Sequence, residues 1–177
     1  MLKVKLGDLD KMALLFQRYH RALYGFIFRM TGKQEQSEDM VQDVFYRLLK
    51  SRHTFTGEGE FRTWMYHVSR NIIKDHYRKS KNDASQYDAD AFAEKLSVAA
   101  QADVDIQKKM ELKQLQQAIN KLDEQSREVI VLSRYQELKY AEIAHILGIS
   151  EGAVKVRVHR AINQLKSLYR PIETKIA

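Results

Sequence analysis

Four side chains near the C-terminal end of the sequence could bind a polyanion. They alternate with apolar residues spaced as on one face of a helix, which predicts that the apolar ones are buried and the others stay off the core. The apolar positions are Val154, Val158, Ile162 and Leu165. The candidate binding residues are Lys155, Arg157, His159 and Arg160. A basic face on the N-terminal half of a helix suits insertion into the major groove of DNA.

The residues before this basic face supply a second helix and a tight turn. Ala144 is small where two helices must approach closely, and Gly148 lies four residues later, where a positive φ is cheap only for glycine. Ile149 can fill the corner, and Ser150 can cap the following helix. The segment therefore predicts a helix-turn-helix that binds DNA. An ordinary helical hairpin with a solvated basic face is the alternative.

A second group combines aromatic rings with basic side chains. Its rings are Phe55, Phe61, Trp64, Tyr66 and Tyr77, and its cations are Arg52, Arg62, Arg70, Lys74, Arg78 and Lys79. Aromatic rings stack on unpaired bases while cations hold the backbone, which indicates contact with single-stranded nucleic acid. The alternative is that the rings form a core, and we assign Phe61 and Trp64 to the core on their own.

Helical periodicity accounts for the segments that must position these groups. The first block predicts a helix over 12–30 that stops at Gly32, a helix capped by Ser37, a loop over 54–60 and a helix over 61–79. The last block begins with a helix marked by Leu112, Leu115, Ile119 and Leu122. A second helix is marked by Val129, Ile130 and Leu132, and the two helices of the helix-turn-helix follow it. No hairpin signal appears, so we expect an all-α chain.

Charge divides the chain into three parts. The net charge is +7, and residues 80–106 carry 2 basic and 6 acidic side chains between two basic blocks. This segment is poor in apolar residues, as in a linker, although residues 89–100 could form a short helix. We therefore expect two small helical domains, 1–79 and 108–177, joined by an acidic linker over 80–107.

Composition excludes several classes of protein. The chain has no cysteine, which rules out a disulfide scaffold and a cysteine nucleophile. Its longest apolar run, residues 22–28, is far below the roughly 20 residues of a membrane span. The N-terminus has no apolar signal region. We expect a cytoplasmic protein with no membrane insertion, no metal and no cofactor.

Several of these motifs, in this order, resemble bacterial sigma factors of the extracytoplasmic-function type, also called group IV. The resembling stretches are residues 37–45, residues 61–66, Arg70 with Asn71, residues 127–129 and the helix-turn-helix. The family often has a proline where this chain has Asp123, which can still cap the next helix. The resemblance implies two helical domains and a linker that threads through RNA polymerase.

The resemblance also implies roles for individual residues. Asp39, Gln42, Asp43 and Arg47 would bind core RNA polymerase. A flipped base of the −10 promoter element would lie among Phe55, Gly57, Glu58, Gly59, Tyr66 and Asn71, with Lys74, Arg78 and Lys79 on the backbone. Lys155, Arg157, His159 and Arg160 would read the −35 element. Promoter DNA and an anti-sigma factor are the further partners implied.

Two other functions compete with this interpretation. An enzyme would need a catalytic or metal-binding arrangement, and none of the six histidines has a metal-ligand spacing. A stand-alone helix-turn-helix transcription regulator would share the C-terminal motif. It would usually carry a ligand-binding or dimerisation module before it, and the first block shows neither βα alternation nor a heptad seam. The sequence therefore favours a non-enzymatic initiation factor.

Overall fold

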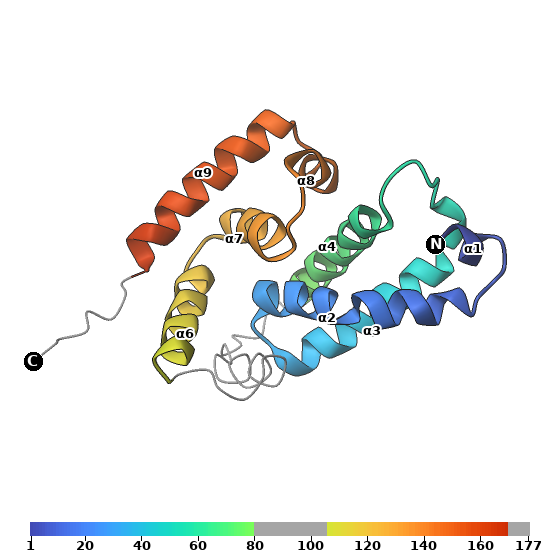
Figure 1. Ribbon diagram of the computed structural model, residues 1–177, viewed down its shortest axis with the longest axis horizontal. Coiled ribbons are helices and arrows are strands. Elements are labelled where there is room, and N and C mark those ends of the chain that lie inside the picture. The colour runs from blue at the N-terminus through green and yellow to red at the C-terminus, as the bar shows by residue number, and fades with distance from the viewer. Residues whose placement is uncertain (80–105, 170–177) are drawn as a thin grey trace, which may run out of the picture.

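The computed structural model describes residues 1–79 and 106–169, which form two groups of packed helices (Figure 1). No β-strand occurs within those two ranges, and the all-α prediction is confirmed. The predicted helix over 89–100 lies outside the described residues. The chain within each group turns back and forth, so that the apolar stripes of successive helices meet.

The first group carries α1 (Leu2–Lys5), α2 (Lys11–Thr31), α3 (Gln34–Lys50), the short 3₁₀ helix η1 (Arg52–Thr54) and α4 (Phe61–Lys79). Its core is formed by Leu23, Phe26 and Ile27 of α2, Met40, Val44 and Leu48 of α3, and Met65 and Ile72 of α4. The helix predicted over 61–79 is confirmed. The end predicted near Gly32 is also confirmed, because Gly32 takes a left-handed φ of 73° directly after α2.

The start predicted for α3 is wrong. Ser37 does not cap this helix, because α3 begins at Gln34 with extended Lys33 at the N-cap position. Ser37 is fully buried one turn inside the helix, where its Oγ donates to the Lys33 carbonyl at 2.5 Å and lies 3.0 Å from Thr31 Oγ1. A serine inside a helix satisfies its hydroxyl on the preceding turn in this way.

The second group carries α6 (Ile106–Asn120), α7 (Glu124–Ile130), the π-helical turn η2 (Val131–Tyr135), α8 (Tyr140–Leu147) and α9 (Glu151–Leu168). Asp123 caps α7, since its side chain accepts a hydrogen bond from the Ser126 amide, and this bond with Ser126 lowers the pKa of the Asp123 carboxyl. One stripe prediction is wrong at Leu112, which is exposed; among the side chains of α6 that the structure describes, the buried ones are Gln116, Ala118 and Ile119.

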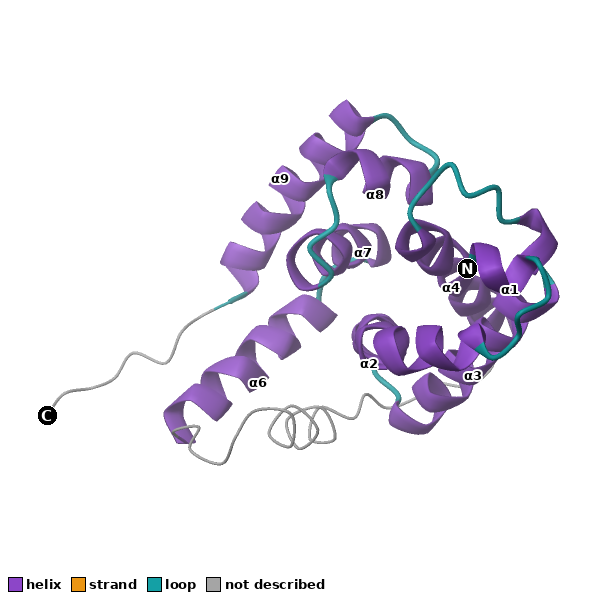
Figure 2. Ribbon diagram, turned by 45° about the vertical axis from the view of Figure 1, so that its right-hand side comes forward, coloured by secondary structure: helices purple, strands orange, loops and turns teal. Residues whose placement is uncertain are grey.

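The two groups pack against each other through α4 and α8, and through α2 and the α6–η2 segment (Figures 1 and 2). Arg127 of α7 donates to the Met30 carbonyl at the end of α2 at 3.1 Å. The Arg29 guanidinium lies 4.0 Å from the centre of the Tyr135 ring. Apolar, polar and cation–π contacts therefore all join the two groups.

The turn between α8 and α9 has the predicted geometry. Gly148 has a left-handed φ of 68°, and Ser150 caps α9 by accepting a hydrogen bond from the Ala153 amide at 3.2 Å. Ile143, Ala144, Val154 and Val158 are buried between the two helices. The helix-turn-helix that the sequence predicts is therefore present.

Two glycines of this motif should respond oppositely to alanine. A Cβ at Gly148 meets no atom within 4 Å, but its left-handed φ should make Gly148→Ala less stable by about 1–2 kcal/mol. Gly152 lies in α9 with only the Ser150 hydroxyl near an added Cβ, so Gly152→Ala should be neutral or more stable by up to about 1 kcal/mol. Urea unfolding of both full-length variants tests this; equal shifts would contradict it.

Candidate functional site

The second helix of the helix-turn-helix presents the predicted basic face to solvent. Lys155, His159 and Arg160 are exposed, and Arg157 is half-buried, while Val154, Val158 and Ala161 of the same helix face the core. The periodicity of α9 therefore separates the apolar and basic residues, but the buried stripe ends on Ala161, and Ile162 and Leu165, predicted to be buried, are half-buried. Such a face can donate hydrogen bonds to base edges and phosphates.

One residue of this face was not predicted as a contact. Val156 is 48% exposed and lies between Lys155 and Arg157. An exposed apolar side chain on a groove-facing helix can contact the methyl group of thymine. Its exposure could have been predicted, because Val156 falls outside the predicted stripe of 154, 158, 162 and 165.

A second exposed face lies on α3. Asp39, Gln42, Asp43 and Arg47 are all exposed, opposite the buried Met40, Val44 and Leu48. Tyr46 lies on the same face and is 63% exposed, although the sequence analysis did not select it. Exposed aromatic side chains among charges are typical of the residues that dominate protein interfaces.

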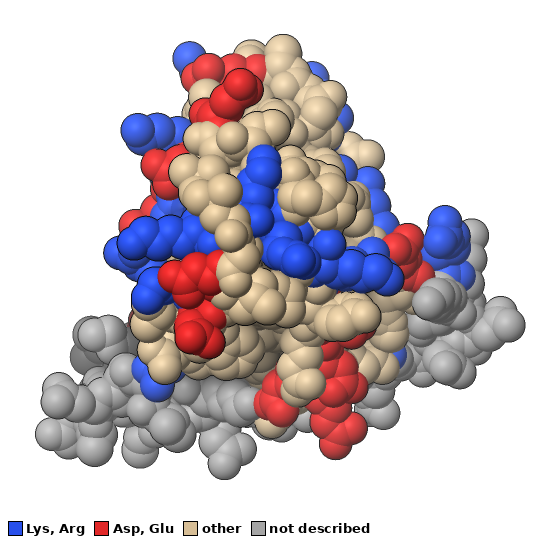
Figure 3. Space-filling view, turned by 90° about the vertical axis from the view of Figure 1, so that its right-hand side faces the viewer, with Lys and Arg blue, Asp and Glu red and all other residues tan. Residues whose placement is uncertain are grey.

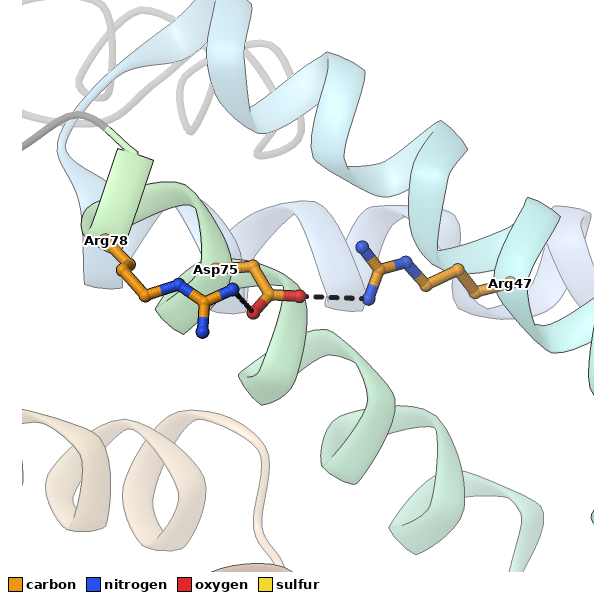
Figure 4. A network of polar contacts seen from close by, with 3 residues as sticks. All are labelled: Arg47, Asp75 and Arg78. Atoms are coloured by element: carbon orange, nitrogen blue, oxygen red, sulfur yellow. Dashed lines mark hydrogen bonds and ion pairs between the residues drawn. The ribbon is translucent and has the colours of Figure 1, made fainter.

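Asp75 of α4 connects this α3 face to the C-terminal end of α4 (Figure 4). One carboxylate oxygen lies 3.2 Å from an Arg47 nitrogen, and the other lies 3.3 Å from an Arg78 nitrogen. Arg78 is 78% exposed and the other two side chains are partly exposed, so each pair contributes little stability. The contacts show that Arg47 and Arg78, one from each candidate interface, lie on adjoining surfaces.

The residues predicted to surround a flipped base are divided by the fold. Gly57, Glu58 and Gly59 form an exposed loop, and Asn71, Lys74 and Arg78 are exposed on α4, whereas the side chain of Lys79 lies outside the described part. Phe55 is buried, with its ring centre 5.2 Å from that of Trp64. The Lys5 Nζ donates a hydrogen bond to the Phe55 carbonyl at 2.7 Å, and this bond connects α1 to the loop.

Tyr66 is the most enclosed of the predicted pocket residues. It is 1% exposed, its ring meets Phe26 edge-on at 5.2 Å, and its hydroxyl donates to Gln136 Oε1 of the second group at 2.5 Å. Burial raises the pKa of the Tyr66 hydroxyl, against a smaller opposing effect of Arg62. Gln136 therefore accepts the hydroxyl of a ring that is packed in the core.

Basic and acidic side chains are unevenly distributed over the outer surface. Figure 3 shows Lys and Arg side chains gathered in a band across the middle of the side of the molecule where α1 lies, with acidic side chains above and below it. Such a gathering of basic side chains attracts polyanions. No cluster of three metal-ligating side chains occurs among residues 1–79 and 106–169.

Two sequence families match the two groups of helices. The model of Sigma-70 region 2 matches residues 15–82, and the model of Sigma-70, region 4 matches residues 112–165. The chain is 34% identical over 177 residues to the ECF RNA polymerase sigma factor SigW of Bacillus subtilis, covering 96% of this chain and 95% of the relative. This chain belongs to the ECF sigma factors of RNA polymerase.

Other comparisons agree with that membership. The RNA polymerase sigma factor YlaC of Bacillus subtilis is 30% identical, with 89% of this chain and 91% of the relative covered. Among solved structures, CnrH in complex with the cytosolic domain of CnrY is 26% identical with a TM-score of 0.72, covering 94% of this chain and 92% of that one.

The sigma factor RpoE of Bartonella quintana, in complex with the anti-sigma factor NepR, shares the fold at 22% identity with a TM-score of 0.70, covering 90% of this chain and 96% of that one. No helix within the described ranges of this sigma factor is long and apolar enough to cross a membrane. The family membership disfavours the stand-alone regulator considered from the sequence.

Proposed function

We propose that the four basic side chains of α9 read the −35 element as the protein's region 4 contact with promoter DNA. The observation that carries this is the exposed basic face of a helix whose start is fixed by Ser150. Arg157 and Arg160 are the candidates for bonds to base edges, because arginine pairs with guanine through two donors. Val156 joins them as an apolar contact.

For the −10 element, the proposal assigns the predicted loop and α4 residues. Asn71, Lys74 and Arg78 lie exposed along α4, and Gly57, Glu58 and Gly59 form the neighbouring loop. Phe55 and Tyr66 would supply rings for an unstacked base. Lys79 is kept as a backbone contact from the sequence alone. An amide at Asn71 offers both donors and acceptors to a base edge.

For core RNA polymerase, the proposal assigns Asp39, Gln42, Asp43 and Arg47, with Tyr46 added from its exposure. Charge reversal at the centre of this face should disturb binding without affecting the fold. Asp43→Lys should weaken holoenzyme formation by about tenfold or more, because like charges opposed across an interface cost several kcal/mol. Titration of labelled sigma factor into core polymerase measures this.

A matched variant keeps that test specific. Glu111→Lys makes the same charge change at an exposed position of α6, and we expect it to leave polymerase affinity unchanged. Both variants should keep wild-type helicity by circular dichroism. Equal affinities for Asp43→Lys and the wild type would remove the α3 face from the proposal.

We also propose the organisation of the whole factor. Residues 1–79 would act on polymerase and the −10 element, residues 108–177 on the −35 element, and residues 80–107 as an acidic connector. Because two solved neighbours are complexes, one with the anti-sigma factor NepR and one with the cytosolic domain of CnrY, an anti-sigma factor is the proposed inhibitor. The protein would work in the cytoplasm and catalyse no reaction itself.

The function is tested by run-off transcription. Core polymerase supplied with this sigma factor should initiate at a subset of promoters in a genomic library, and the two proteins should co-elute in gel filtration. Co-elution without promoter-specific transcripts would contradict the proposed function.

A further inference from the structure

The short helix α1 lies beside the exposed loop that precedes α4. It packs on α2 and on η1, and η1 leads directly into this loop. Figures 1 and 2 both show α1 next to the segment that joins η1 to α4. We call residues 55–60 the −10 loop, after the role proposed for its residues. Two segments that are about 50 residues apart in the sequence therefore meet here.

The position of α1 is fixed although the helix has only four residues. A single helical turn does not persist in water by itself, because its nucleation is unfavourable. Val4 is fully buried and anchors the helix to the first group. Beyond the helix, the Asp8 amide donates to the Lys3 carbonyl at 3.0 Å, and Gly7 takes a positive φ of 106°. An anchored α1 can support a neighbouring segment.

Lys5 contacts the first residue of the −10 loop. Its Nζ donates a hydrogen bond to the Phe55 carbonyl at 2.7 Å, a length typical of a charge-assisted bond. The Phe55 ring is held separately, with its centre 5.2 Å from that of Trp64 and 6.4 Å from that of Phe61. The start of the loop is therefore fixed by α4 through its ring and by α1 through its backbone.

Leu2 contacts the middle of the −10 loop. A Cβ added at Gly57 would lie 2.9 Å from Leu2 Cδ2 and 3.5 Å from Leu2 Cδ1, so the leucine side chain fills the space beside this glycine. Gly57 has a positive φ of 84°, which glycine adopts readily. Leu2 is nevertheless 52% exposed. It therefore forms a wall beside the loop rather than part of the core.

The −10 loop has weak restraints of its own. Residues 56–60 are exposed, and Gly57 and Gly59 widen the range of backbone conformations. The Glu58 amide donates to Thr56 Oγ1 at 3.3 Å, which is long for an N–H donor. A loop that selects a base needs its donors and acceptors in place beforehand, because ordering them during binding lowers affinity. The contacts from α1 meet that need at two points of the loop.

We propose that Leu2 and Lys5 are positioning residues for −10 recognition, which fix the path of the −10 loop and so determine how strictly it selects the flipped base. Lys5 acts through the Phe55 carbonyl and Leu2 acts through Gly57. This inference rests on the proposed assignment of the loop to the −10 element. It adds a segment that precedes residues 15–82, the part of the chain that matches region 2.

Selectivity at one base is the first measurement. Holoenzyme is titrated with a pre-melted promoter found by run-off transcription, in four versions that differ only at the −10 position where the wild type discriminates most. Lys5→Met removes the donor and keeps the side-chain length. It should lower the ratio of affinities for the preferred base and the others by about three- to tenfold, the factor that one hydrogen bond contributes to an ordered state. Leu2→Ala should lower the ratio in the same direction, and both variants should bind core polymerase as the wild type does.

Three further variants keep this test specific. Lys3→Met and Leu6→Ala make the same chemical changes at neighbouring exposed positions, and they should keep the wild-type ratio. Lys5→Arg retains a charged donor and should keep most of it. If Lys5→Met weakens binding to all four versions equally, Lys5 contacts a phosphate instead, and its positioning role is rejected. An unchanged ratio in both Lys5→Met and Leu2→Ala also rejects the proposal.

The order of the loop is measured in the free sigma factor. Trp64 is the single tryptophan of the chain, it is half-buried, and its ring lies next to that of Phe55. A loosened Phe55 should expose the indole, so acrylamide should quench the fluorescence of Lys5→Met more strongly than that of Lys3→Met. Equal quenching of these two variants would contradict the proposal.

A loop variant tests the −10 assignment separately. Glu58→Ala changes an exposed loop side chain and is assayed on the same four promoter versions. If Glu58→Ala changes the affinity ratio while Lys5→Met and Leu2→Ala do not, the positioning role alone is rejected. If none of the three variants changes the ratio, the assignment of this loop to the −10 element is wrong, and the positioning role is rejected with it.

Discussion

A holoenzyme carrying Arg157→Ala and Arg160→Ala together is expected to lose most of its binding to promoters that depend on the −35 element. Each arginine that bonds a base edge contributes on the order of 1–3 kcal/mol and specifies one position. The two side chains are three residues apart on α9 and so are neighbours on one face. We therefore expect the double variant to lose more affinity than either single variant, without strict additivity. Binding of duplex promoter at moderate salt measures the effect.

The control for this double variant is another basic residue of the same helix. Lys166→Ala removes an exposed charge of α9 outside the proposed reading face, and we expect only a small change in its promoter affinity. Base-specific contact also predicts that Arg157→Ala and Arg160→Ala relax selectivity at different positions. Wild-type binding by the double variant would show that this helix does not read the promoter.

The second large effect is expected at the −10 contact. Phe55→Leu with Asn71→Ala should transcribe poorly from duplex promoter and bind the single-stranded −10 oligonucleotide weakly in the holoenzyme. Holding a flipped base costs a few kcal/mol, and one aromatic stack returns about 1–3 kcal/mol of it. Leucine is chosen because Phe55 packs on Trp64, and alanine there would cost about 3–5 kcal/mol of stability.

Phe61→Leu provides the matched control. Phe61 belongs to the same aromatic cluster, with its ring centre 6.4 Å from that of Phe55, but it has no place in the proposed pocket. Its variant should lose comparable packing and keep oligonucleotide binding. Both variants should form holoenzyme normally. If the Phe55 and Asn71 variant binds the oligonucleotide as the wild type does, the base is held elsewhere.

Much of the fold could be predicted because local chemistry fixes it. Gly32 and Gly148 end helices in the left-handed conformation, and Asp123 and Ser150 cap the helices that follow them. The prediction failed at Ser37. The N-cap is Lys33, four residues earlier, and the serine hydroxyl bonds back to the Lys33 carbonyl on the preceding turn.

The site was predictable only where a single helix presents it. Periodicity alone places Asp43 and Arg157 off the buried stripes of α3 and α9. It does not reveal that Gln136, 70 residues further along the chain, accepts a hydrogen bond from Tyr66. Periodicity describes the faces within one helix, whereas this contact depends on how two groups of helices pack together.

The Asp75 carboxylate described above pairs with Arg47 and Arg78 at 3.2 Å and 3.3 Å, and all three side chains are at least partly exposed. Salt screens attractions between exposed charges. Rising salt should therefore release both arginines from Asp75 while it weakens their attraction to polymerase and DNA, so that the two effects on these contacts oppose each other.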